Sequence, residues 1–91
     1  MWSGNIKNEK TEFVPSMKIT SRILNILLEK NSIKRTELSQ LANLHYGRLT
    51  KYLHWMKKKS LIEFVAMDEK IVVKLTHNGR SFVVMMSEEN K

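Results

Sequence analysis

Residues 45–59, HYGRLTKYLHWMKKK, combine residue types that bind polyanions. Five of these fifteen positions are Arg or Lys, and none is acidic. A guanidinium can donate two hydrogen bonds to the edge of a guanine, whereas lysine ammonium groups commonly pair with phosphates. The segment therefore suits a groove of nucleic acid, an acidic membrane surface or an acidic protein, and its periodicity narrows the choice.

The apolar residues of this segment recur at the spacing of one helix. At about 100° per residue, they form a single stripe, and the opposite face is polar and cationic. Small side chains near the start of that face would let the helix approach base edges in the major groove. Arg48 and Trp55 share one shoulder, and Lys57 lies on the other. The stripe consists of Leu49, Tyr52, Leu53 and Met56, and the polar face consists of Gly47, Thr50, Lys51, His54 and Lys58.

Positive charge is concentrated in the middle of the chain. The 91 residues carry a net charge of +7. Residues 30–59 hold eight basic residues and one acid, Glu37, so this third alone accounts for +7. Residues 1–29 contribute +1 and residues 60–91 contribute −1. A solvated face usually mixes both signs, so this segregation indicates a polyanionic partner.

Two further helices are expected before the cationic segment. The first spans about residues 16–30, where apolar residues recur at amphipathic spacing. The second is short, from about 36 to 42, with Thr36 capping its first turn. Leu38 and Leu41 are expected to face the core. With the cationic helix that follows after a brief turn, the second helix predicts a helix-turn-helix.

A β-hairpin and a last helix follow. Residues 62–75 contain two runs rich in Val, Ile and Phe, separated by Asp-Glu at 68–69. Thr76 can cap the final helix. The order helix, helix, helix, hairpin, helix predicts an α+β, mainly α fold for residues 16–91. Residues 1–15 are polar, lack periodicity and are expected to form a flexible arm.

The ordered motifs resemble a known family. They are KRTELSQLANLHYGRLTKYLHWMKKKSLIEF and then KIVVKLTHNGRSFVVMM. They are similar to the small archaeal winged helix-turn-helix domains of transcriptional regulators and chromatin-associated proteins, and more distantly to MarR-like regulators. The resemblance implies a recognition helix at 45–59, and a wing at 62–75 that touches the flanking minor groove or backbone, where Lys70 is basic. The implied DNA-facing positions of the recognition helix are Tyr46, Arg48, Thr50 and Lys51.

We therefore expect a sequence-specific transcriptional regulator that binds double-stranded DNA, cytoplasmic and associated with the nucleoid. Arg48 and Thr50 are expected to read bases, and the lysines to neutralise phosphates. Lys59 adds one more positive charge at the end of the helix. The expected DNA contacts are Lys34, Arg35, Thr36, His45, Tyr46, Gly47, Arg48, Thr50, Lys51, His54, Lys57, Lys58 and Lys70.

A homodimer is expected because the first and last helices are apolar over more of their surface than one small core can cover. The last helix contains SFVVMM, which is apolar nearly all round. The chain stops at Lys91, so a long coiled coil is not available for the contact. The expected interface residues are Leu24, Leu28, Phe82, Val84 and Met85.

Other functions remain open. The protein could organise DNA without sequence preference, or use its winged helix to bind a protein. A membrane-surface helix or RNA binding fits less well, because the apolar stripe is needed by neighbouring helices and no aromatic stacking platform is evident. With one Asp, no Cys and three scattered His, we expect neither an enzyme nor a metal site, cofactor or small-molecule ligand. No apolar run approaches the roughly 18 residues of a membrane span.

Overall fold

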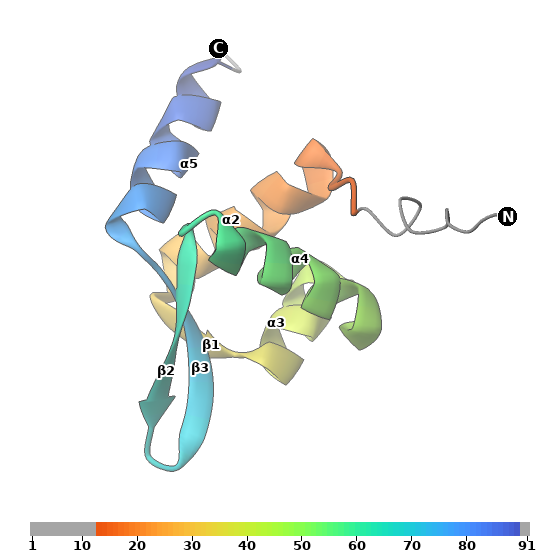
Figure 1. Ribbon diagram of the computed structural model, residues 1–91, viewed down its shortest axis with the longest axis vertical. Coiled ribbons are helices and arrows are strands. Elements are labelled where there is room, and N and C mark those ends of the chain that lie inside the picture. Colours follow the sequence, from red (N-terminus) through yellow and green to blue (C-terminus); the bar gives the residue numbers. More distant parts are fainter. Residues whose placement is uncertain (1–12, 90–91) are drawn as a thin grey trace, which may run out of the picture.

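The computed structural model describes residues 13–89, and residues 1–12 of the predicted arm lie outside the described part. The predicted order of three helices, a hairpin and a last helix is confirmed, and the fold is α+β and mainly helical (Figure 1). A short strand after the first helix completes the sheet. The elements are α2 (Met17–Lys30), β1 (Ser32–Lys34), α3 (Arg35–Ala42), α4 (Tyr46–Lys58), β2 (Ile62–Met67), β3 (Lys70–Leu75) and α5 (His77–Glu89).

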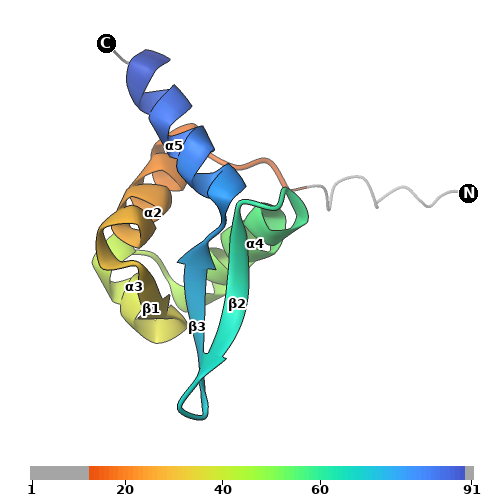
Figure 2. The ribbon, with the colours of Figure 1, turned by 90° about the vertical axis from the view of Figure 1, so that its left-hand side faces the viewer.

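The three strands form one antiparallel sheet in the order β1-β3-β2. The helices α2, α3 and α4 gather beside one end of the hairpin, and its other end extends beyond them (Figures 1 and 2). α5 packs against α2 and β3, and its far end projects away from the body (Figure 2). The sheet and the helix-turn-helix therefore share a single core, while the hairpin tip and the end of α5 stand apart from it.

α2 begins and ends where its sequence provides caps. The Ser16 side chain accepts a hydrogen bond from the Ile19 amide at 3.3 Å, which satisfies one of the free amides of the first turn. At the other end Asn31 has a φ of 70° and its amide donates to the Leu27 carbonyl. Ile23, Leu24 and Leu27 are buried along one face. This side of α2 contacts α3, α5 and β3, which fixes the helix at the centre of the fold.

The turn between α3 and α4 is closed by a tight C-cap. Asn43 adopts the left-handed conformation with a φ of 56°, and the Leu44 amide donates to the Ser39 carbonyl at 3.0 Å. This six-residue closure is the Schellman pattern that commonly ends helices. The Ser39 hydroxyl also donates to the Leu44 carbonyl at 2.6 Å. These bonds set the angle at which α4 leaves α3.

Two predictions about α3 were wrong. The helix begins at Arg35, so Thr36 lies inside the first turn and does not cap it; no side chain among the described residues fills that role. Leu41 is 47% exposed, and Ala42 is fully buried instead. α2 and α4 contact the short helix, and Leu38 and Ala42, one turn apart, occupy the buried side.

The hairpin closes with a two-residue turn. Asp68 and Glu69 have φ values of 50° and 65°, the left-handed conformation that a type I′ turn requires at both positions. The register is continuous, with Ile62 opposite Leu75 and Met67 opposite Lys70. Such turns match the right-handed twist of the strands, so the pair twists as one ribbon.

The start of α5 is locked to the base of the hairpin. Thr76 caps the helix as predicted, because its hydroxyl accepts a hydrogen bond from the Gly79 amide at 3.0 Å. The same hydroxyl donates to the Ser60 carbonyl at 2.6 Å, and the Thr76 amide donates to the Leu61 carbonyl at 3.0 Å. A Cβ at Gly79 would overlap the Leu61 carbonyl oxygen, so only glycine permits this approach.

Candidate nucleic-acid interface

α4 is divided lengthwise into a buried face and an exposed cationic face. The predicted apolar stripe of Leu49, Tyr52, Leu53 and Met56 is buried. Because these four side chains fix the rotation of the helix, the remaining positions must point away from the core. The exposed residues of α4 are Tyr46, Gly47, Arg48, Thr50, Lys51, His54, Lys57 and Lys58.

The first turn of α4 leaves room for close approach. His45 occupies the N-cap position, and within residues 13–89 no side chain accepts a hydrogen bond from the amides that follow it. Gly47 has open space around it, since a Cβ there would find no described atom within 4 Å. The first turn of α4 also contains no acidic residue. Free amides and the positive end of the helix dipole favour a phosphate at such a place.

Thr50 is partly committed to its own helix. Its hydroxyl donates a hydrogen bond to the Tyr46 carbonyl at 2.9 Å. The hydroxyl proton is therefore used, and the oxygen lone pairs and the methyl group are what Thr50 can offer to a base. A thymine methyl or an amino donor would fit this side chain.

The N-terminal part of the chain contacts the buried side of α4, opposite its cationic face. The Ser16 amide donates to the Tyr52 hydroxyl at 2.9 Å. Phe13, which belongs to the segment predicted as an arm, packs edge-on against the Tyr52 ring with centroids 4.8 Å apart. Arg22 donates to the Ala42 carbonyl at 2.8 Å and so fixes the end of α3. Sequence reasoning missed these supports, because none of them follows a local pattern.

A second group of polar residues lies at the start of α3. Lys34, Arg35 and Thr36 are all exposed there. Since α3 packs against α4, the charges of Lys34 and Arg35 add to those of α4. Lys70 is not brought to this group, because it begins β3 at the tip of the hairpin, away from the helices (Figure 1). Its exposed neighbours in the turn are acidic.

Trp55 is half-buried and packs against the edge of the core. Its position on the shoulder of α4 beside Arg48 leaves one part of the indole accessible. The ring therefore serves mainly to seal the core beneath the cationic face.

The predicted dimer residues separate into buried and exposed groups. Leu24 is fully buried within the single chain, so its assignment to a dimer interface was wrong: α5 packs across α2 and covers it. Phe82 is half-buried against the core. Leu28 is 39% exposed, and Val84 and Met85 are each 56% exposed. These three remain available to a partner.

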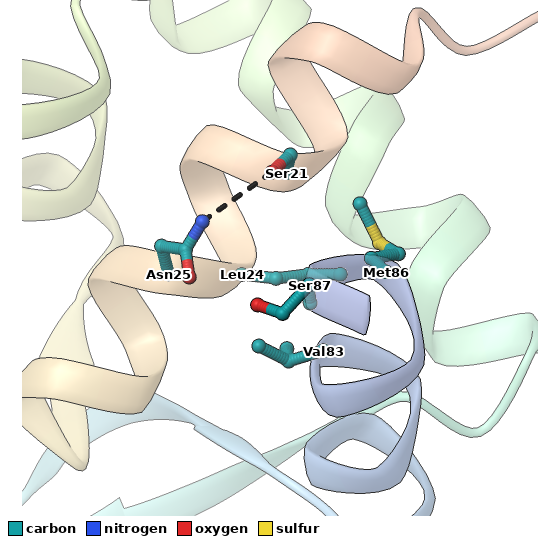
Figure 3. Close-up of a pocket in the computed structure, with 6 residues that line it drawn as sticks. All are labelled: Ser21, Leu24, Asn25, Val83, Met86 and Ser87. Atoms are coloured by element: carbon teal, nitrogen blue, oxygen red, sulfur yellow. Dashed lines mark hydrogen bonds between the residues drawn. The ribbon is translucent and has the colours of Figure 1, made fainter. Parts of the chain in front are cut away.

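An open groove lies between α2 and α5 (Figure 3). Leu24, Val83 and Met86 supply its apolar part. On the α2 side the Asn25 amide nitrogen donates a hydrogen bond to the Ser21 hydroxyl at 3.3 Å. With Ser87, which also lines the groove, they give it a polar rim.

Across the side chains described for residues 13–87, no three or more His, Asp or Glu gather in a way that could hold a metal ion. Among the helices of residues 13–89, none has the length and apolar composition needed to cross a membrane.

A sequence model of the winged helix-turn-helix family matches residues 15–91. A search of curated proteins finds no match. Among solved structures, the MarR family transcriptional regulator SPO1453 from Silicibacter pomeroyi is 24% identical, with a TM-score of 0.69, over 79% of this chain and 52% of that one. The reduced form of MarR from E. coli is 25% identical, with a TM-score of 0.68, over 71% and 50%.

The DNA-binding protein Sso10a-2 from Sulfolobus solfataricus has the same fold. It is 20% identical, with a TM-score of 0.69, over 82% of this chain and 77% of that one. By contrast, the present chain spans only about half the length of the two MarR-type structures.

Proposed function

The chain belongs to the winged helix-turn-helix family, and from this premise we propose that it binds double-stranded DNA as a sequence-specific transcriptional regulator. α4 would lie in the major groove. The observation that carries this proposal is the division of α4, whose apolar stripe is buried while the exposed face carries Arg48, Lys51, Lys57 and Lys58 and no acidic residue. A surface helix with no DNA role would be expected to mix charges of both signs on that face.

Base reading is assigned to Arg48 and Thr50. Arg48 is exposed in the first turn of α4, and the N-terminal residues of a recognition helix make its base contacts. A guanine is the natural partner for Arg48. Gly47, with open space around it, would let the backbone come close to the bases.

Phosphate contacts would surround these two residues. The exposed cations of α3 and α4 flank the face, and Lys70 could touch the backbone from the wing. Such contacts set affinity and register without reading sequence. The residues assigned to this role are Lys34, Arg35, Lys51, Lys57, Lys58, Lys59 and Lys70, with Thr36, His45, Tyr46 and His54 as polar contacts beside them.

The named structural neighbours support a DNA-binding role, since two are MarR-type proteins and one is described as a DNA-binding protein. Because the chain spans half of the MarR-type structures, its activity is argued from its own surface. A DNA-binding role would place the protein at the nucleoid.

A homodimer that uses the outer side of α5 and α2 belongs to the proposal. Leu28, Val84 and Met85 are exposed, and an exposed apolar surface of this kind often marks a protein contact. The groove between α2 and α5 could receive a partner helix. A dimer would set two α4 helices about 34 Å apart on one face of DNA. Sedimentation showing only a monomer would remove this part of the proposal.

A DNA-organising role without sequence preference is the second candidate. The Thr50 hydroxyl is engaged with its own helix, which reduces direct base reading to Arg48 and a few neighbours. Both candidates predict salt-sensitive DNA binding, but only the first predicts a preferred site.

The test compares duplex DNA, single-stranded RNA and acidic vesicles at two salt concentrations, followed by selection of DNA sites from a random pool. The regulator predicts strong duplex binding that weakens with salt and an enriched motif. Duplex binding with no enriched motif would support the organising role. Equal binding to all three partners would reduce the protein to a general polyanion binder. Binding to none of them would favour a protein-interaction winged helix.

A further inference from the structure

The wing has an unprotected sheet edge. β2 lies at the border of the sheet, and within residues 13–89 it pairs with β3 alone. It is six residues long, IEFVAM, with an unbroken register and neither Pro nor Lys, and Glu63 is its single charged residue. Proteins usually protect such edges with short strands, lysines, prolines or bulges. The opposite edge follows that rule, because β1 has three residues and includes Lys34.

The outer backbone groups of β2 belong to alternate residues. Across a two-residue hairpin turn, the flanking pair, Met67 and Lys70, exchanges both backbone hydrogen bonds, and the pattern then alternates along the strands. Ile62, Phe64 and Ala66 therefore direct their amide and carbonyl groups away from β3. Beyond the base of the hairpin this edge extends past the helices (Figure 1).

Apolar side chains continue onto this free part of the wing. Phe64 is 36% exposed, and Met67 and Ile71 are each more than two fifths exposed. Phe64, Ala66 and Ile71 lie on the same face of the sheet as Ile33 and Val73, which are buried. The apolar face of the sheet therefore continues toward the tip of the hairpin, where it is exposed. The phosphate contact proposed for Lys70 does not use this strip.

The charged residues on either side of β2 indicate which partner would pair with its free edge. Lys57, Lys58 and Lys59 come shortly before β2. Asp68 and Glu69 come directly after it and Lys70 follows them, so these three residues at the tip of the hairpin carry a net charge of −1. All six residues are exposed. If two β2 strands pair antiparallel, the lysines of each copy approach the acidic turn of the other, and this occurs at both ends. Edge strands of two identical chains are therefore complementary in charge as well as in hydrogen bonding.

We propose that the free edge of β2 pairs antiparallel with β2 of a second copy, centred on Phe64, so that two three-stranded sheets join into one. In this register Phe64 faces its own counterpart, and Ile62 faces Ala66. These are the positions whose outward backbone groups can exchange hydrogen bonds. Opposed aromatic side chains add to the stability of such a pair.

This contact uses a different surface from the dimer proposed through α2 and α5. It shares lysines with the proposed phosphate contacts, so it is tested without DNA. Two distinct self-contacts on one chain would link copies into a series longer than a dimer, since each copy would hold a different neighbour on each surface. On DNA, such a series would appear as cooperative binding.

The first test isolates the wing contact. In a parent variant, Val84→Glu and Met85→Glu remove the exposed apolar side chains of α5, and self-association is followed by sedimentation without DNA. We expect the parent to form dimers. Adding Ala66→Pro removes one outward amide and should give monomers, because proline is tolerated where an edge amide faces solvent. The matched control is Ala66→Thr, which keeps the amide and should leave the dimer in place.

A charge swap distinguishes the wing contact from a folding defect. In the same parent, Lys59→Glu or Glu69→Lys alone should weaken dimerisation by about tenfold, the effect of 1.4 kcal/mol. The two together should restore it, because each copy again presents opposite charges. Far-ultraviolet circular dichroism should be unchanged in every variant.

A single cysteine tests the register. The chain has no cysteine, so Phe64→Cys introduces the one thiol. In a pair centred on residue 64, the two Cα atoms lie about 5.5 Å apart, within the range that a disulfide spans. Mild oxidation should link the copies, and Ala66→Pro should prevent it. The proposal is overturned if the parent is monomeric, if Ala66→Pro leaves the dimer intact, or if the charge swap restores nothing.

Discussion

The backbone amide of Ser16 donates a hydrogen bond to the hydroxyl of Tyr52 across 36 residues of sequence. Ser16 is also the N-cap of α2, and Tyr52 lies on the buried stripe of α4. The start of the central helix is thereby tied to the helix that carries the cationic face. The orientation of that face depends on a contact made on its opposite side.

Tyr52→Phe should lower the free energy of unfolding by about 1–2 kcal/mol, because the Ser16 amide loses its partner in a partly buried place. The ring contact with Phe13 would be kept. Urea denaturation measures the change. Tyr46→Phe is the matched control: Tyr46 is 42% exposed, so the same substitution there should alter stability by less than about 0.5 kcal/mol. Equal effects at the two tyrosines would mean that the bond to Ser16 contributes nothing.

Gly79→Ala should destabilise the fold by about 1–3 kcal/mol, in the range of other overpacked sites. The added methyl would overlap the Leu61 carbonyl oxygen, which is backbone and itself accepts the Thr76 amide. Thermal unfolding at fixed pH would show the loss. If Gly79→Ala left the midpoint unchanged, the junction between the hairpin and α5 would have to be looser than the structure shows.

Most of the fold could be predicted from the sequence because its signals are local. The buried and exposed faces of α4 follow from 3.6-residue periodicity, and Thr76 occupies the cap position that its type and place indicate. The hairpin followed from two β-rich runs. Its Asp-Glu turn was the weak point, since neither residue favours left-handed backbone as glycine does.

The errors have a common physical cause. Whether a residue of an amphipathic helix is buried depends on which neighbours cover it, and the sequence does not name them. Leu24 was assigned to a dimer because α2 has a wide apolar stripe, but α5 covers that residue. Leu41 was assigned to the core, but it is exposed, and the smaller Ala42 is buried in its place. The bonds from Ser16 and Arg22 span 36 and 20 residues, so no short pattern could indicate them.

Gly47→Ala should separate stability from binding. A glycine within a helix costs roughly 0.5–1 kcal/mol relative to alanine, and the added methyl would meet open space. The protein should therefore become more stable in urea. If this turn lies against DNA, the same methyl should weaken binding to a selected duplex. Improved stability with unchanged affinity would place the DNA elsewhere on α4.

Arg48→Ala should weaken binding to a selected site by about 1–3 kcal/mol and relax the preference at a single base pair, if its guanidinium bonds to both acceptors of a guanine. Competition with sites that differ at one position locates that base pair. Arg48→Lys is the matched control, because it keeps the charge but not the two-pronged geometry. Full activity in the alanine variant would remove Arg48 from the base-reading residues.

Lys58→Ala should act in another way, because Lys58 lies in the last turn of α4, where it is assigned to a phosphate. Losing one phosphate contact should lower the slope of log affinity against log salt by about one unit while leaving the preferred sequence unchanged. Fluorescence anisotropy over a series of salt concentrations measures this slope. Lys30→Ala is the control. Lys30 is also exposed, but it ends α2 and is not among the proposed contacts, so the slope of this variant should match that of the wild type. An unaltered slope for Lys58→Ala would show that the end of α4 points away from DNA. The lysines of the last turn of α4 would then be expected to contact only the acidic hairpin turn of a second copy.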